Sequence, residues 1–171
     1  MPLDDQTVNR AKQHAYRLLS YRSRTAGELR DRLRQKGFGR TLIDEVLHQL
    51  EVEGYVNDRR FAGDWARYRL QAKPMGRRRL ALELQRRGLD RALIEEVLHE
   101  VYSEFDEITL AQQAAQKRLR VTGSPQTQNE RQRLVRYLAG QGFDTTVIRS
   151  VLGMFSPADD LPDLLPDDVV C

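Results

Sequence analysis

Arginine is the residue type in this chain whose number and spacing could support a chemical role. One basic group surrounds Leu29 and Leu33, and a second surrounds Leu80 and Leu84. The first comprises Arg22, Arg24, Arg30, Arg32, Arg34 and Lys36, and the second comprises Lys73, Arg77, Arg78, Arg79, Arg86 and Arg87. Guanidinium groups bind phosphate oxygens bidentately without reading bases. The matching positions favour a surface for a polyanion over a solvated helix face neutralised by neighbouring Glu.

Catalytic patterns are not found. His48 and His99 stand at equivalent positions fifty-one residues apart, too far apart in stacked repeats to share a ligand. The only cysteine is Cys171, and the sequence has no glycine-rich phosphate loop, no G-x-S-x-G and no HExxH spacing. We therefore expect a protein that is not an enzyme and needs neither a cofactor nor a metal ion.

A threefold repeat positions the arginines. The spacing Leu-x3-Leu-x3-Gly occurs at Leu29–Gly37, Leu80–Gly88 and Leu134–Gly142. Five apolar residues follow each glycine at matching offsets: Leu42, Ile43, Val46, Leu47 and Leu50; Leu93, Ile94, Val97, Leu98 and Val101; Val147, Ile148, Val151, Leu152 and Phe155. A unit this small must stack on its neighbours to bury its apolar face. The pattern predicts an all-α fold, an elongated and curved tandem array of three three-helix repeats with a helix-turn-helix-like form.

The predicted repeats span residues 1–55, 56–104 and 105–156, and an acidic, proline-rich tail without regular structure covers 157–171. We expect the first helix of each repeat from Thr7 to Arg22, from Asp58 to Gln71 and from Asp106 to Arg120. Alanines four residues apart on each of these helices predict a close packing seam.

Helix ends are marked by capping residues. Thr25 and Glu28 fit a capping box, and Asn129 with Gln132 fits a looser one. The glycine of each repeat is expected to end a helix in the left-handed conformation. Asp90 and Asp144 are predicted N-caps of the third helices.

The charge is unevenly distributed. The net charge of the chain is +3, yet five of its 25 acidic residues lie beyond Pro157. The remaining 20 acids face 28 basic residues, a net charge of +8. This balance indicates a polyanionic partner, nucleic acid before membrane. No apolar stretch resembles a membrane span or a signal peptide, so we expect a cytoplasmic protein.

Several motifs of the second repeat resemble those of the RecX family of bacterial recombination regulators. They are Gly54-Tyr55-Val56-Asn57-Asp58, Phe61-Ala62, Lys73-Pro74-Met75-Gly76 and the run from Leu80 to Leu89. With the repeat, the likeness covers about residues 7 to 155. The chain departs from the family in having Val56-Asn57 after the Gly-Tyr pair, Gly63 within a helix and the acidic tail.

The resemblance implies binding to the RecA recombinase, chiefly as a filament on single-stranded DNA. Family members typically limit filament growth, ATP hydrolysis and strand exchange, and so modulate homologous recombination, DNA repair and the SOS response. We expect Arg77, Arg78 and Arg79, with Arg86 and Arg87, to form the centre of the interaction surface, and Lys73 to belong to the same surface. Arg30, Arg32, Arg34 and Lys36 would extend it. The protein is expected to be a monomer.

Two other functions are compatible with the sequence. The first is non-specific binding to single-stranded or double-stranded DNA without RecA, and the second is a purely structural helical adaptor. Acidic residues of the third helices, such as Glu45 and Glu95, argue against reading of bases. The sequence leaves open filament capping or groove insertion, the partner that the basic surface faces, the role of the tail and the oligomeric state.

Overall fold

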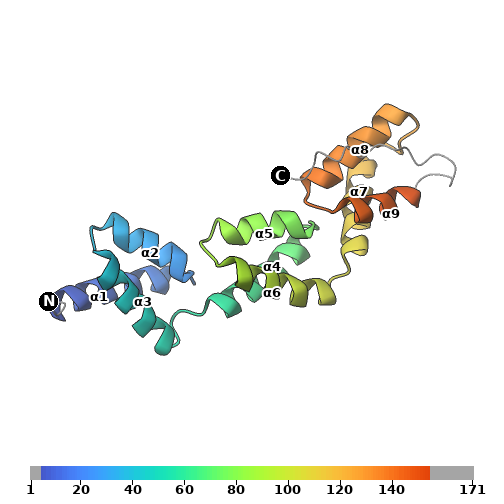
Figure 1. Ribbon diagram of the computed structural model, residues 1–171. Coiled ribbons are helices and arrows are strands. Elements are labelled where there is room, and N and C mark those ends of the chain that lie inside the picture. The colour runs from blue at the N-terminus through green and yellow to red at the C-terminus, as the bar shows by residue number, and fades with distance from the viewer. Residues whose placement is uncertain (1–4, 155–171) are drawn as a thin grey trace. The chain divides into compact units, whose positions relative to one another are not determined.

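The computed structural model describes residues 5–154, which form nine α-helices and no strand. The helices are α1 (Asp5–Tyr21), α2 (Ala26–Gln35), α3 (Arg40–Val52), α4 (Asp58–Ala72), α5 (Arg77–Gln85), α6 (Arg91–Glu104), α7 (Glu107–Thr122), α8 (Gln128–Gly140) and α9 (Thr145–Gly153). They follow one another as three groups of three, which confirms the all-α tandem repeat (Figure 1). Phe155 and the tail 157–171 lie outside the described residues.

The repeated leucines and glycines have the roles that the spacing predicted. Leu29, Leu33, Leu80, Leu84, Leu134 and Leu138 are buried, with exposed fractions between 0% and 3%. Gly37, Gly88 and Gly142 have φ values of 87°, 76° and 88°. Only glycine adopts this left-handed conformation without a steric penalty from Cβ, so it ends the second helix and turns the chain toward the third.

Contacts divide the chain into two compact units, and the boundary between them passes through the second repeat. Of the described residues, unit 1 contains 5–65 together with Glu83–Val97, and unit 2 contains Ala66–Leu82 together with 98–154. The first repeat therefore lies wholly in unit 1 and the third wholly in unit 2.

In unit 1, α1, α2 and α3 pack against one another around a leucine-rich core. The predicted alanine seam lies within it, because Ala11 and Ala15 are fully buried. Small side chains at this spacing allow a second helix to approach closely. At one edge Lys12 and Tyr16 both donate hydrogen bonds to Glu53, and the Tyr16 ring meets Tyr55 edge to face.

In unit 2, α7 packs against both α8 and α9. The fully buried residues here include Ala111 and Ala115 of α7 and Leu138 of α8. The Tyr102 hydroxyl donates a buried hydrogen bond of 2.9 Å to the Met75 carbonyl. Burial raises the pKa of Tyr102 far above its usual value, so this hydroxyl remains a donor at any physiological pH.

The capping predictions were partly right. Asp90 and Asp144 cap the third helices by accepting hydrogen bonds from Ala92 and Thr146. The Thr25 hydroxyl accepts from the Glu28 N–H as expected. The Glu28 carboxylate, however, forms ion pairs with Arg22 and Arg87, so this capping box is only half formed.

The complete capping box lies at the start of α8. Its N-cap is Thr127 and its returning carboxylate is Glu130, so the prediction of Asn129 and Gln132 was wrong by two residues. Glu130 accepts hydrogen bonds from the N–H groups of Gln126 and Thr127. The start of α8 is thus satisfied within its own repeat.

Candidate partner-binding surface

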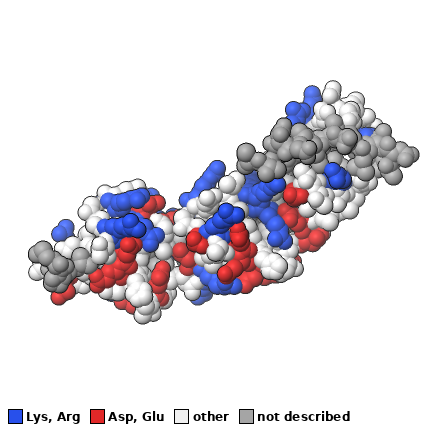
Figure 2. All heavy atoms as spheres, in the orientation of Figure 1, with Lys and Arg blue, Asp and Glu red and all other residues white. Residues whose placement is uncertain are grey.

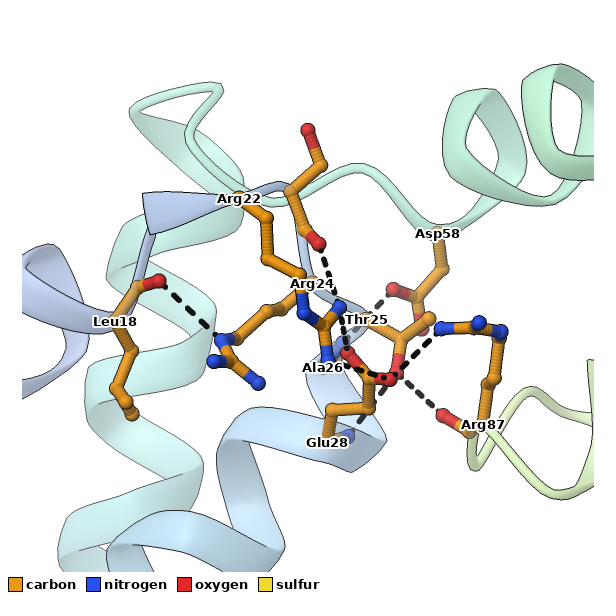
Figure 3. Close-up of polar contacts among 9 residues, drawn as sticks. Leu18, Arg22, Arg24, Thr25, Ala26, Glu28, Asp58 and Arg87 are labelled. Atoms are coloured by element: carbon orange, nitrogen blue, oxygen red, sulfur yellow. Dashed lines mark hydrogen bonds and ion pairs between the residues drawn. The ribbon is translucent and has the colours of Figure 1, made fainter. Parts of the chain in front are cut away.

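The start of α2 contacts the turn after α5, which belongs to the next repeat. We call this contact the first junction, and all of its residues lie in unit 1. The Thr25 hydroxyl donates to the Arg87 carbonyl, and Asp58 accepts a 2.8 Å hydrogen bond from the Ala26 N–H (Figure 3). A carboxylate suits a helix start because it pairs with an N–H group at the positive end of the helix dipole.

Arg87 is a central residue of the first junction. Its guanidinium lies 3.0 Å from a Glu28 carboxylate oxygen, with side-chain exposures of 22% and 17% for the two residues. It also stacks on the indole of Trp65, at 3.6 Å from the ring centroid. Both contacts hold the Arg87 side chain within the protein, so its role here is to pack the first repeat against the second.

Glycines allow the two backbones to meet at the first junction. A Cβ placed on Gly27 would lie 2.6 Å from the Gly88 carbonyl oxygen, closer than real Cβ contacts come. Gly88 has a positive φ as well, so its position requires glycine for two reasons. The sequence showed Gly88 as a helix end but gave no sign that another backbone lies against it.

The start of α5 and the turn after α8 form a comparable second junction, wholly within unit 2. Its close glycine, Gly76, precedes the helix, whereas Gly27 is the second residue of α2. Gly76 donates from its N–H to the Gln141 carbonyl at 3.0 Å. Glu107 accepts from the Arg77 N–H at 3.0 Å, as Asp58 accepts from Ala26. A Cβ on Gly76 would lie 2.2 Å from the Gly142 carbonyl oxygen.

Three predicted site residues, Arg77, Arg78 and Arg79, form contacts at this second junction. Arg77 pairs with Glu107 at 3.1 Å and lies over the Tyr102 ring, 4.8 Å from its centroid. Arg78 lies 3.6 Å from Asp144, and Arg79 donates a 3.0 Å hydrogen bond to Gln141. The side chains of Arg77 and Arg78 remain 46% and 50% exposed. A partner could therefore reach them, but only in competition with these contacts.

The predicted site arginines of the first repeat also have intramolecular partners. Arg34 pairs with Asp31 at 2.7 Å, Arg30 with Asp44 at 3.5 Å, and Arg32 donates to Gln35 at 3.3 Å. These contacts are exposed, so water and salt weaken them and a polyanion could displace the acids. Red acidic atoms lie among the blue basic ones on the face drawn in Figure 2.

Lys73, Arg86 and Lys36 differ from the other predicted residues. None of their side chains forms a hydrogen bond or an ion pair with the part of the chain that the structure describes. Arg86 is exposed at the end of α5 and Lys73 is half-buried after α4. Their charges are available to a partner without the loss of an internal contact.

A basic hollow in the first repeat contains residues that the sequence analysis missed. It has a volume of about 410 Å³ and is lined by Arg10, Gln13, His14, Arg17, Lys36 and Phe38. Of these only Lys36 was predicted. Burial and the charges of Lys36 and Arg17 lower the pKa of His14. The spacing of Arg10, His14 and Arg17 along α1 puts them on one helix face, and this signal was present in the sequence.

Residues 5–154 contain neither a membrane-spanning helix nor a cluster of metal-binding side chains. None of the described helices is long and apolar enough to cross a membrane. No group of three or more His, Cys, Asp or Glu residues in this range is arranged to hold a metal ion.

Comparison with known proteins gives matches along most of the chain. Models of the first, second and third three-helix domains of RecX match residues 11–50, 57–98 and 106–152. The regulatory protein RecX of Amycolatopsis mediterranei is 32% identical over 163 residues, which cover 93% of each chain. That of Chlorobaculum tepidum is 32% identical over 165 residues, covering 94% of this chain and all of the relative. The crystal structure of RecX from Lactobacillus salivarius superposes with a TM-score of 0.78 at 22% identity, over 86% of this chain and 96% of that one.

Proposed function

Since the chain belongs to the RecX family of regulatory proteins, we propose that it regulates a RecA recombinase. In this proposal it binds the RecA filament on single-stranded DNA and limits filament growth, ATP hydrolysis and strand exchange. It thereby modulates recombination, DNA repair and the SOS response, in the cytoplasm and without catalysis of its own. The observation that carries the proposal is the match of all three RecX domains, in order, over most of the chain.

The physical support comes from charge and repetition. Exposed cations attract the phosphates of a filament, and their contacts weaken as salt rises. Several weak contacts on one chain add up to tight binding when they engage a repeating partner together. A tandem array with basic residues in more than one repeat meets both conditions.

The surface proposed for this binding centres on Lys73 and Arg86, two cations without a partner among residues 5–154. The exposed parts of Arg77 and Arg78 add to it, as do Arg30, Arg32, Arg34 and Lys36 in the first repeat. Arg79 and Arg87 contribute through the junctions that they stabilise, since Gln141 of the following repeat holds Arg79 and Glu28 of the preceding repeat holds Arg87.

The test is the steady-state ATPase rate of RecA on excess single-stranded DNA while this protein is added. Suppression at well below one protein per RecA monomer is expected, because a regulator of filaments acts on many protomers at once. The charge-reversal variant Lys73→Glu/Arg86→Glu should need a higher concentration. The control Arg91→Glu reverses one charge of α6 outside this surface, on a side chain that is 92% exposed, and should act like the unchanged protein.

The same experiment separates the proposal from non-specific DNA coating. Coating would suppress the ATPase only when the protein covers the DNA, and excess DNA would remove the effect. Fluorescence anisotropy on naked DNA at several salt concentrations measures that binding directly. An unchanged ATPase rate with intact DNA binding would overturn the proposal.

A further inference from the structure

The turn between the second and third helices of a repeat receives the preceding repeat. At the first junction the Arg87 carbonyl accepts from Thr25, and the Arg87 side chain holds Glu28. At the second, the Gln141 carbonyl accepts from Gly76, and the Gln141 side chain holds Arg79. The same three features recur: a turn glycine with positive φ, a carbonyl that accepts from a helix start, and a side chain that holds the helix's first turn.

The first repeat has the same turn. Lys36, Gly37 and Phe38 correspond to Arg87, Gly88 and Leu89, and Gly37 has the same left-handed conformation. Within the described residues nothing lies on this turn, because a Cβ on Gly37 would meet no atom within 4 Å. The basic hollow of Arg10, His14, Arg17 and Lys36 is the face that corresponds to the receiving faces of the two junctions.

The charge of this face indicates what it would receive. Lys36 takes the place of Arg87, which binds the Glu28 carboxylate at the first junction. Arg10 and His14, fifty-one residues before Phe61 and Trp65, put basic groups where the second repeat has aromatic rings. None of the six residues that line the hollow is acidic, and Arg10, Arg17 and Lys36 form no ion pair with the described chain.

We infer that this hollow binds the first turn of a helix in a partner protein, capped by Ser or Thr and with Glu at its third position. The hydroxyl would donate to the Lys36 carbonyl, and the carboxylate would pair with Lys36 and with the guanidinium groups of Arg10 and Arg17. Thr25 and Glu28, the third residue of α2, are the pattern for this ligand because they make these contacts at the first junction.

A helix start fits this site better than a phosphate does. Its hydroxyl and N–H groups are donors, and the receiving carbonyl in both junctions accepts from a donor of this kind. A phosphate group at neutral pH presents chiefly acceptors and would satisfy the cations alone. The inference goes beyond the proposed function, because it concerns a protein ligand and holds whatever that protein is.

The test is an NMR titration of the full-length, 15N-labelled protein. The probe is an alanine-rich helical peptide of about 16 residues, long enough to form a helix, that begins Thr-Ala-Gly-Glu. A second peptide with Gln in place of Glu is the control. We expect the first peptide to shift the amide signals of Lys36, Gly37 and Phe38. It should also raise the pKa of His14, since a carboxylate offsets the positive charges of Arg17 and Lys36.

Variants of the protein sharpen the result. Lys36→Gln and Arg17→Gln should each weaken peptide binding about tenfold, the usual cost of losing a hydrogen bond to a charged group. Arg40→Gln is the matched control, because Arg40 lies in the same repeat, its side chain is 95% exposed, and its ion pair within the described residues is with Asp44. It should bind the peptide as the unchanged protein does.

Three outcomes would overturn the inference. The first is no shift at the turn, and the second is equal binding of the Gln peptide. The third is tighter binding of inorganic phosphate or of a thymidine oligonucleotide at the same signals, which would assign the hollow to phosphate. The titration contains neither recombinase nor a filament, so its failure and a failure of the ATPase test remain distinguishable.

Discussion

The two junctions share a backbone arrangement and differ in the side chains that complete it. At the first, a Thr hydroxyl and a Glu–Arg ion pair join α2 to the following turn. At the second, a backbone N–H and an Arg–Gln hydrogen bond join α5 to its turn. Both keep a carboxylate on the helix start and a pair of glycines in close approach. The close approach at each junction therefore depends on backbone groups and glycine, whereas the charges of the side chains beside them differ between the two junctions.

The largest expected effect tests the core beneath the junctions. Leu84→Ala should lower the free energy of unfolding by about 2–5 kcal/mol, because Leu84 is fully buried and the change leaves a cavity. Leu82→Ala is the control on the same helix, where the side chain is 52% exposed, and should change stability by less than about 0.5 kcal/mol. Urea denaturation followed by circular dichroism measures both, and equal effects would contradict the assigned helix face.

The next effect tests the close approach of the glycines. Gly76→Ala should destabilise the protein by about 1–3 kcal/mol, because its Cβ would lie 2.2 Å from backbone that cannot give way. Gly140→Ala, in α8 of the same unit, has no atom within 4 Å and should stabilise by up to about 1 kcal/mol. If both variants unfold at the same urea concentration, the second junction is not formed as described.

A smaller effect compares the side chains of the two junctions. Arg87→Ala should cost about 2 kcal/mol, since it removes a partly buried ion pair and the stacking on Trp65. Gln141→Ala removes one hydrogen bond from the Arg79 guanidinium to an uncharged amide and should cost less, about 1.5 kcal/mol. Trp65 is the only tryptophan, so its emission reports the first junction directly. We expect a red shift of the Trp65 emission for Arg87→Ala and none for Gln141→Ala. A shift in both variants would contradict the assignment of the two side chains to separate junctions.

The smallest effect concerns acid titration. Burial raises the pKa of Asp58 at the first junction, more than the Ala26 N–H lowers it. The Thr146 N–H lowers the pKa of Asp144, which faces Arg78 at the second. Asp58 thus holds its proton more tightly in the folded chain, and its contribution to stability is lost as pH rises through its pKa. The contribution of Asp144 is present above the usual Asp value of 3.8 and is lost as pH falls through its lowered pKa.

Carboxyl-carbon NMR between about pH 2 and pH 7 measures both groups, a range that spans ordinary Asp values. Asp58→Asn identifies the Asp58 signal and should remove its part of the pH dependence. Finding the pKa of Asp58 at or below that of Asp144 would contradict the burial of the first junction.

Local patterns predicted the repeat because each of its signals lies within a few residues. Leu80 and Leu84 mark a buried face, and Gly88 marks the helix end four residues later. The intramolecular partners of the arginines could not be predicted in this way. Arg77 meets Glu107 thirty residues later, and Arg87 meets Glu28 fifty-nine residues earlier. Which acid neutralises which arginine follows from how repeats join, and no local pattern contains that information.

The basic hollow shows the opposite case. Arg10, His14 and Arg17 have a helical spacing that is visible in the sequence, but they lie on a first helix, outside the repeated basic groups around the second helices. These three side chains of α1 meet Lys36 only because α1 packs against the turn after α2. The structure was needed to show that these residues meet.

The capping box of α8 has a consequence for the order of assembly. The starts of α2 and α5 take acceptors from the repeat that follows each of them, whereas Thr127 and Glu130 complete the start of α8 locally. The third repeat can therefore form its helices unaided, and each earlier repeat gains its missing acceptor only by docking onto a later one. We expect the array to assemble from its C-terminal end toward its N-terminal end, against the direction in which the ribosome delivers it.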